Sequence, residues 1–508
     1  MRYIAALDVG TTTVRCHVLD ENAATIAASI EKVELIYPEP GFVEIDPDQL
    51  WEKVVKVIKD ALRASNVNPE AITCLGISTQ RSTFTTWNKN DGRHYHRFIT
   101  WKDLRADSLV KEWNSSLTLK GLRLSSHILY AISRNKRFLA GSCFKFMNTQ
   151  MSLRLLWALH HVPGLQEAAS SGNAIFGGVD CWLLYKLTGK HVTDVSSAST
   201  TGLFDPFTMS WAGWMMNVLK LPSCIFPEVV DTVHNFGVTP KDLFGAEIPI
   251  VCSMADQAAS TFGSGCFKQG DLKVTMGTGS FVNVNSGAKP HASVTGLYPV
   301  VGWRIGKELV YIVEGASNDT GTLIEWAKSI GIIKDPTETS ETANSVTDTD
   351  GVSFVPAFGG LQAPLNDHSA AAGFIGIKPT TRRPHIIRAL LESIVYRILL
   401  LYEALCQETN FTYKRIRVDG GVSKNDFILQ LLADLTGLEV ERASSIEMSI
   451  LGVAFLAGLQ CGIWKDKSDL FKIRKVERVF RPREESRKRY QPVIAHWKRA
   501  IERFMKWY

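Results

Sequence analysis

Residues 6–21, ALDVGTTTVRCHVLDE, combine a strand, a Gly-Thr turn and a second strand. Two apolar runs, at residues 4–8 and 13–20, flank a turn that contains Gly10 and three threonines. This arrangement is typical of a β-hairpin.

Residues 272–287, LKVTMGTGSFVNVNSG, repeat this form with GTG at the turn. Two matching hairpins, roughly half a chain apart, predict two domains of related design. We place the boundary after residue 263, which gives an N-terminal domain of residues 1–263 and a C-terminal domain of residues 264–508.

Short apolar strands alternate with amphipathic helical stretches along the chain, which predicts an α/β fold. Helices are expected at residues 48–64 and 383–405. A chain of 508 residues is longer than a domain with a single hydrophobic core usually is, which agrees with two domains. At 45% apolar and 21% charged, the composition is that of a soluble globular protein.

The nine cysteines are scattered singly, from Cys16 to Cys461, with no C-x-x-C pair. This usage predicts reduced thiols, no metal cluster and a cytoplasmic location. No signal peptide is expected, because residues 3–7 already read as a strand. No apolar run approaches the roughly 20 residues of a membrane-spanning helix.

The positive charge is concentrated at the C-terminus. Residues 472–508 hold thirteen Lys and Arg against four Glu, whereas the whole chain has a net charge of +6. The rest of the chain is therefore about three charges negative, which does not favour nucleic-acid binding. An apolar stripe runs through this tail at helical spacing: Ile494, Trp497, Ile501, Phe504 and Tyr508. It predicts a terminal helix docked on the body with a solvated basic face; contact with a membrane surface is the alternative.

The first turn carries groups suited to phosphate. Gly10 allows backbone amides to approach a phosphate, and the threonines at 11–13 add hydroxyl donors. Asp8, which ends the preceding strand, is placed to hold Mg²⁺, and Arg15 is suited to meet a phosphoryl group. The alternative is a hairpin whose glycine serves the backbone alone. The second turn favours phosphate binding, because the phosphates of a nucleotide need contacts from both sides.

A third turn lies in RIRVDGGVSKNDFILQLLADLTG, residues 415–437. A strand leads into Asp419 and two glycines, and a helix is expected from near Asn425 to Gly437. Paired glycines leave a bare backbone against which adenine can lie, although such turns also occur for packing alone.

Two further segments have a composition typical of loops. Gly315 and Gly321 predict a glycine-bearing loop before a helix. Residues 334–350, rich in Thr, Ser, Asp and Glu, predict an exposed insertion or loop.

Asp256 is the candidate catalytic base. It follows the apolar strand IPIVCSMA and precedes Gln257 and a helix that starts with small residues. A carboxylate at the carboxyl end of a strand occupies the usual place for chemistry in an α/β protein; its alternative role is a helix N-cap. The patterns G-x-x-x-x-G-K-[ST] and G-x-G-x-x-G do not occur, nor does the protein-kinase catalytic loop, so those nucleotide-binding classes lose their main support.

Together these segments resemble the FGGY carbohydrate kinases, and among them the glycerol kinases. The resemblance extends from about residue 3 to beyond residue 460. It is carried by ALDVGTTTVR, IYPEPGFVEIDP, GISTQRSTFTTW, ITWKDLR, GVDCWLLYKLTG, ADQAASTFG, MGTGSF, FVPAFGGLQAP, HIIRALLESIVYR, RVDGGVSKNDF and LGVAFLAGL. It implies two actin-like (ribonuclease H-like) ATPase domains with a nucleotide cleft between them, and ATP-dependent phosphorylation of glycerol to sn-glycerol 3-phosphate.

The resemblance also implies roles for individual residues. Asp256 would be the base, Asp8 and Asp256 would lie at Mg²⁺, and Arg15 would stabilise the transferring phosphoryl group. The implied ATP contacts are Thr11, Thr12, Thr13, Gly277, Thr278, Gly321, Glu325, Gly421 and Asn425. The implied acceptor contacts are Arg81, Ser82, Trp101, Asp256, Gln257 and Phe281.

Four departures from the family pattern concern mainly the acceptor. Ser82 stands where glycerol kinases have a glutamate that binds a glycerol hydroxyl, and Thr149 falls near a pocket tyrosine. Residues 365–368 read LNDH instead of an aromatic pair followed by Asp, and Glu325 replaces a usual glutamine. A lost hydroxyl contact costs roughly 1–3 kcal/mol of discrimination.

Two alternatives therefore stay open beside glycerol phosphorylation. One is a kinase for another polyol or sugar, and the other is an ATP-binding scaffold with impaired catalysis. The expected partners are ATP and a small polyol, with a homo-oligomer possible and no nucleic acid.

Overall fold

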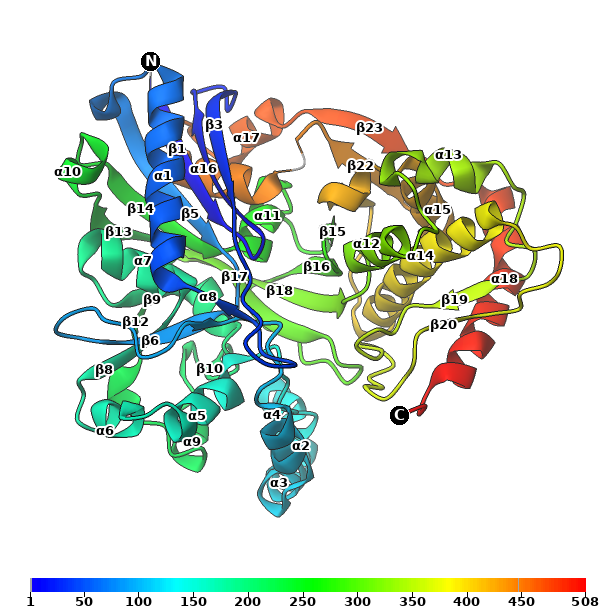
Figure 1. The fold of residues 1–508 in the computed structure, drawn as a ribbon, viewed down its shortest axis with the longest axis horizontal. Coiled ribbons are helices and arrows are strands. Elements are labelled where there is room, and N and C mark those ends of the chain that lie inside the picture. Colours follow the sequence, from blue (N-terminus) through cyan, green and yellow to red (C-terminus); the bar gives the residue numbers. More distant parts are fainter. Residues whose placement is uncertain (1, 446) are drawn as a thin grey trace.

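The computed structural model describes residues 2–445 and 447–508. Two mixed sheets, one in each half of the chain, form its framework (Figure 1). The order in the first sheet is β13-β14-β5-β1-β2-β3. These strands are β1 (Tyr3–Val9), β2 (Thr13–Leu19), β3 (Thr25–Lys32), β5 (Ile72–Thr79), β13 (Val233–Val238) and β14 (Pro249–Ala255). β1, β2 and β3 are antiparallel neighbours, whereas β5 and β14 run parallel to β1.

The second sheet has the order β17-β18-β16-β15-β21-β22-β23. Its strands are β15 (Leu272–Met276), β16 (Ser280–Gly287), β17 (Tyr298–Ile305), β18 (Glu308–Ser317), β21 (Arg415–Asp419), β22 (Glu439–Ala443) and β23 (Val476–Phe480). β15, β16 and β18 are antiparallel neighbours, and β21 and β22 run parallel to β15. Both sheets thus contain the same five-strand unit, and the two predicted hairpins occupy equivalent places in it. The domain boundary after residue 263 stays a prediction; it falls between the last strand of one sheet and the first strand of the other.

Long helices precede the parallel strands in both halves. α1 (Pro47–Ser65) leads from β3 to β5, and α14 (Arg383–Glu408) precedes β21. Both were predicted to within three residues. α1 begins at Pro47 because the side chain of Asp46 accepts hydrogen bonds from the two backbone N–H groups of residues 48 and 49, and it ends where Asn66 turns left-handed at φ 53°.

Two helices cross between the sheets: α11 (Asp256–Gly263) and α16 (Met448–Gln460). Their backbones approach so closely that a Cβ on Gly452 would overlap the carbonyl oxygen of Ala259. Phe262 of α11 belongs to one buried cluster with Ile4 of the first sheet and Trp303 of the second. The two halves of the chain therefore share a core at this crossing.

The remaining elements surround this framework. A small sheet in the order β4-β7-β6-β8 contains β4 (Glu44–Ile45), β6 (Phe84–Asn88), β7 (Phe98–Ile99) and β8 (Ala174–Gly178). The other helices of the first half are α2 (Asp107–Ser115), α3 (Leu117–Ser133), α4 (Lys136–Ser142), α5 (Met151–His161), α6 (Leu165–Ser170), α7 (Val179–Thr188), α8 (Val195–Ser199), α9 (Gly213–Val218) and α10 (Lys241–Phe244). Those of the second half are α12 (Gly321–Ser329), α13 (Thr339–Asn344), α15 (Asp426–Thr436), α17 (Lys467–Ile473) and α18 (Glu484–Phe504). Short strand pairs complete the fold: β9 (Val192–Asp194) with β12 (Glu228–Val230), β10 (Phe204–Asp205) with β11 (Ser210–Trp211), and β19 (Ser353–Val355) with β20 (Gly373–Ile375).

Two loop predictions hold only in part. A loop at residues 318–320 does precede α12, which begins at Gly321, and residues 334–350 are mostly exposed. Residues 334–350 contain α13, whose Ala343 is buried in the core of the second half, so apolar contacts override the polar composition. Gly315 lies inside β18, paired with Val282. A Cβ there would lie 2.7 Å from a methyl group of Leu297, so close packing accounts for this glycine.

The basic tail forms α18, which docks on the body as predicted. Trp497 and Ile501 are buried, and the indole Nε1 of Trp497 donates to the carbonyl of Phe354 at 2.7 Å. Tyr508 lies beyond the helix and is 88% exposed, so the apolar stripe ends before it. None of the helices in the described part of the chain combines the length and apolar character needed to cross a bilayer.

Candidate active site

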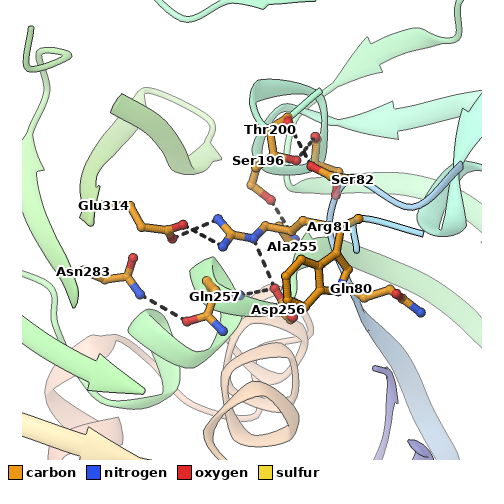
Figure 2. A network of polar contacts seen from close by, with 12 residues as sticks. Gln80, Arg81, Ser82, Ser196, Thr200, Ala255, Asp256, Gln257, Asn283 and Glu314 are labelled. Carbon is orange, nitrogen blue, oxygen red and sulfur yellow. Dashed lines mark hydrogen bonds and ion pairs between the residues drawn. The ribbon is translucent and has the colours of Figure 1, made fainter. Parts of the chain in front are cut away.

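Asp256 lies where β14 ends and α11 begins. Its oxygen Oδ1 accepts a hydrogen bond from the backbone N–H of Gln257 at 2.7 Å, but the N-cap residue of α11 is Ala255, so Asp256 does not serve as the predicted N-cap alternative. The N–H of Ala255 in turn donates to the hydroxyl of Ser196 at 2.9 Å. These bonds fix the strand end that carries the carboxylate (Figure 2).

Arg81 faces Asp256 because β5 and β14 are parallel neighbours that end together, with Thr79 opposite Ala255. Its Nε lies 3.4 Å from an Asp256 oxygen. Its two terminal nitrogens donate to the two carboxylate oxygens of Glu314 at 2.9 and 2.7 Å. Figure 2 shows the guanidinium between the two acids, which come from opposite halves of the chain.

Glu314 is fully buried on β18 and also accepts the hydroxyl of Tyr298 at 2.5 Å. Burial opposes the charge on Arg81, but Glu314 and Asp256 raise its pKa above the usual value. The Arg81 guanidinium therefore stays charged, and the bidentate bond to Glu314 fixes its plane. Neither Glu314 nor Tyr298 was predicted from the sequence.

Burial raises the pKa of two neighbouring carboxyl groups. The pKa of Asp256 rises to about 6, since burial and the nearby Asp8 outweigh the attraction of Arg81. Burial also raises the pKa of Asp8, although the nearby Ser78 and the charge of Arg15 act to lower it. One Asp8 oxygen is buried without a hydrogen-bond partner. Two close carboxylates with one unsatisfied oxygen are suited to a cation.

Gln257, next to the candidate base, is held by residues of the second half. Its Oε1 accepts from Lys273 Nζ at 3.1 Å and from Asn283 Nδ2 at 3.2 Å. Lys273 is completely buried on β15, and its Nζ lies 3.7 Å from an oxygen of Asp419. Burial lowers the pKa of Lys273. Because Oε1 is occupied, the Gln257 amide can offer its Nε2 donor to a ligand. Lys273 was not predicted from the sequence.

The first hairpin turn is tied to the expected acceptor pocket. Trp101 Nε1 donates to the Thr11 hydroxyl at 2.9 Å, and that hydroxyl donates to Gln80 Oε1 at 3.2 Å. Thr12 is exposed at the tip of the turn. The Arg15 side chain donates to the Thr13 hydroxyl at 3.1 Å and forms an ion pair with Glu447 in the second half.

The second hairpin turn packs on the start of α12. The backbone N–H of Gly321 donates to the carbonyl of Gly277 at 3.0 Å, and a Cβ on Gly321 would lie 2.6 Å from that oxygen. Thr278 is exposed at the tip of the turn. Glu325 is also exposed, one helical turn along α12.

The third turn joins β21 to α15. Gly420 adopts φ 88°, and a Cβ there would lie 2.6 Å from the carbonyl of Met276, whereas a Cβ on Gly421 would meet no protein atom within 4 Å. Asn425 is the N-cap of α15: its Oδ1 accepts the N–H of Ile428 at 3.1 Å. The predicted helix from Asn425 to Gly437 is confirmed.

The remaining two expected acceptor residues, Ser82 and Phe281, also contact protein groups. Ser82 adopts a left-handed conformation at φ 57°, and its hydroxyl donates to the carbonyl of Thr200 at 3.0 Å. Phe281 lies with its ring centroid 5.7 Å from the Arg81 guanidinium carbon. The backbone carbonyl of Thr149 accepts a hydrogen bond from the Arg154 side chain.

The fold and these residues define a carbohydrate kinase of the actin-like ATPase type. Residues 3–263 match the N-terminal domain of the FGGY family of carbohydrate kinases, and residues 272–461 match its C-terminal domain. The chain belongs to this family, and the predicted fold class is confirmed.

Its relatives along the whole chain are glycerol kinases. Glycerol kinase 5 of Danio rerio is 48% identical over all of this chain and 97% of its own length. Glycerol kinase 2 of Thermotoga maritima is 38% identical over all of this chain and 99% of its own length. The crystal structure of Plasmodium falciparum glycerol kinase with ADP superposes with a TM-score of 0.87 at 27% identity, covering 99% of this chain and 98% of that one.

Proposed function

We propose that this protein transfers the terminal phosphoryl group of ATP to a terminal hydroxyl of glycerol, giving sn-glycerol 3-phosphate. Relatives that are glycerol kinases cover the whole chain. The observation that carries the chemistry is Asp256, a carboxylate of raised pKa held at 3.4 Å from Arg81 at the end of β14.

Asp256 acts as the general base. With a pKa of about 6 it is ionised at neutral pH, yet it is basic enough to take a proton as the oxygen–phosphorus bond forms. Arg81 and the Nε2 of Gln257 bind acceptor hydroxyls, while Trp101 and Phe281 cover the carbon face. The fixed partners of Arg81 and Gln257 support this role, because a preorganised donor loses little entropy on binding.

The nucleotide binds between the Gly/Thr turns. Thr11, Thr12, Thr13, Gly277 and Thr278 contact phosphates, and Gly321, Glu325, Gly421 and Asn425 line the nucleoside side. The bare surface of Gly421 supports this assignment. Arg15 offsets phosphoryl charge once ATP competes with Glu447 for its guanidinium.

Asp8 and Asp256 are the two carboxylates that would lie at Mg²⁺: Asp8, whose unsatisfied oxygen fits that role, would hold the ion, and Asp256 would stay free to accept the proton. When bound, the ion would neutralise phosphate charge. Mg²⁺ usually takes only one or two carboxylates beside substrate oxygens and water, so two acids suffice.

The nine free cysteines support a reducing, cytoplasmic location.

Ser82 favours a second candidate, a kinase for another polyol or sugar. Its hydroxyl is occupied by Thr200, so it supplies neither the charge nor the reach of a glutamate. The loss of one hydroxyl contact shifts selectivity between acceptors and leaves phosphoryl transfer intact.

The test is ADP release by the purified protein with MgATP and a panel of polyols and sugars. We expect glycerol-dependent release that Asp256→Asn abolishes while ATP still binds. If only another polyol is phosphorylated, the acceptor is not glycerol, but the proposed mechanism still applies. Full activity of Asp256→Asn would refute the assignment of the base.

A further inference from the structure

An exposed apolar stripe on α3 lies outside the kinase site. Figure 1 shows α2, α3 and α4 projecting together as a helical lobe from the N-terminal half of the chain. Four aliphatic residues follow one another on α3 at spacings of seven, four and four, which places them on one helical face. Their exposures are 85% for Leu117, 63% for Leu124, 51% for Ile128 and 77% for Ile132. The stripe is about 22 Å long at the rise of an α-helix.

The opposite face of α3 holds the helix in place. Leu119 is buried there, and α4 packs so closely that a Cβ on Gly141 would lie 2.8 Å from the Ser126 hydroxyl. The side chain of Arg123 donates to the carbonyl of Phe144 at 2.7 Å. The stripe is therefore presented by a helix that is anchored on its other side.

A row of basic residues borders the stripe. Lys120 and His127 lie seven residues apart on the adjoining face, Arg134 follows as the C-cap residue of α3, and all three are exposed. Lys120 and Arg134 form no ion pair with any residue that the structure describes. Residues 113–150 contain six Lys and Arg and no Asp or Glu.

We propose that α3 docks this protein on an anionic phospholipid surface. An aliphatic face beside a row of cations is the pattern of a helix that lies in the membrane interface, where aliphatic side chains enter the acyl boundary and cations meet lipid phosphates. A second copy of the chain fits less well, because pairing two such faces would bring cationic rows together without carboxylates to neutralise them. A membrane site on α3 is separate from the basic tail, whose apolar side is docked on the body.

The test is sedimentation of the full-length protein with vesicles, either of phosphatidylcholine alone or mixed with phosphatidylserine. We expect pelleting with the mixed vesicles, weaker at high salt. The variant Leu124→Ser/Ile128→Ser/Ile132→Ser should reduce the partition coefficient at least about tenfold. Lys120→Glu/Arg134→Glu should reduce it for the mixed vesicles only. Phosphoryl transfer in solution should be unchanged in both.

The matched control is Ile30→Ser/Ile330→Ser/Ile377→Ser, which removes exposed isoleucines elsewhere and should pellet like the wild type. The proposal is overturned if the protein does not pellet with anionic vesicles, or if the α3 variant pellets equally well. It is also overturned if light scattering shows a dimer that the α3 variant dissociates and that does not bind vesicles.

Discussion

At the residue scale, Asp256 links burial to the pH range of activity. A base with a pKa of about 6 is protonated below that pH, so we expect kcat/KM to fall about tenfold per pH unit there. A profile of kcat/KM against pH, measured with saturating MgATP, tests this. An acid limb centred near pH 4, the ordinary range of an aspartate, would contradict the raised pKa.

The raised pKa of Asp256 also predicts that removing its charge stabilises the folded protein. The folded-state pKa lies above the unfolded value, so between pH 4 and 6 the folded protein retains a proton that the unfolded chain has lost. The free energy of unfolding therefore falls as pH rises through this window. Asp256→Asn should raise it by roughly 1 kcal/mol at pH 7.5 and change it little at pH 4. Thermal melting at both pH values measures this, and a lower melting temperature at pH 7.5 would contradict it.

Glu314 acts through Arg81, so its replacement should change acceptor binding more than nucleotide binding. Glu314→Gln removes the charge that fixes the guanidinium, and breaking a buried pair costs about 3–5 kcal/mol. We expect a lower melting temperature and a KM for glycerol at least about tenfold higher, with the KM for ATP little changed. Tyr298→Phe is the matched control, because it removes one hydrogen bond to Glu314 and leaves the ion pair. An unchanged KM for glycerol in Glu314→Gln would exclude the positioning role.

At the scale of elements, the turns were predictable from sequence and the contacts between strands were not. Gly-Thr turns between apolar runs identified both hairpins, and Asn425 and Gly437 marked both ends of α15. Glu314 gave no such signal, because its partner Arg81 lies 233 residues away and no local pattern records that pairing. Lys273 could not be predicted for the same reason. A lysine in an apolar strand is expected to be exposed, and its burial follows only from its contacts with Gln257 and Asp419, which are distant in the sequence. The loop prediction for residues 334–350 missed α13 because it rested on polar composition, whereas this helix is stabilised by a few buried contacts.

The third turn allows packing and ligand contact to be separated, since its two glycines differ. Gly420→Ala should destabilise the fold, because φ 88° and the Met276 carbonyl exclude a Cβ. Gly421→Ala meets no protein atom, so we expect an unchanged melting temperature and a KM for ATP about five- to tenfold higher. Melting curves and ATP saturation curves of the two variants give the comparison. A normal KM for ATP in Gly421→Ala would place the nucleotide elsewhere.

At the scale of the whole molecule, the candidate site is assembled from both halves of the chain. Asp8, Arg81 and Asp256 come from the first half, while Glu314 and Lys273 come from the second. The crossing of α11 and α16 sets how the two groups face each other, because Asp256 is the first residue of α11. The geometry of the site thus depends on a backbone contact that lies outside it.

Gly452 tests this dependence. Alanine normally stabilises a helix interior by about 1 kcal/mol relative to glycine, and Gly121→Ala on α3, where a Cβ meets nothing within 4 Å, should show that gain. Gly452→Ala should show the opposite, because its Cβ overlaps the Ala259 carbonyl and must push the helices apart, at a cost of roughly 1–3 kcal/mol. The displacement moves Asp256 relative to Arg81 and Glu314, and a shift of about 1 Å can reduce kcat about a hundredfold. Melting temperature and kcat of both variants decide the matter. If Gly452→Ala melts and turns over like the wild type, the crossing does not set the geometry of the site.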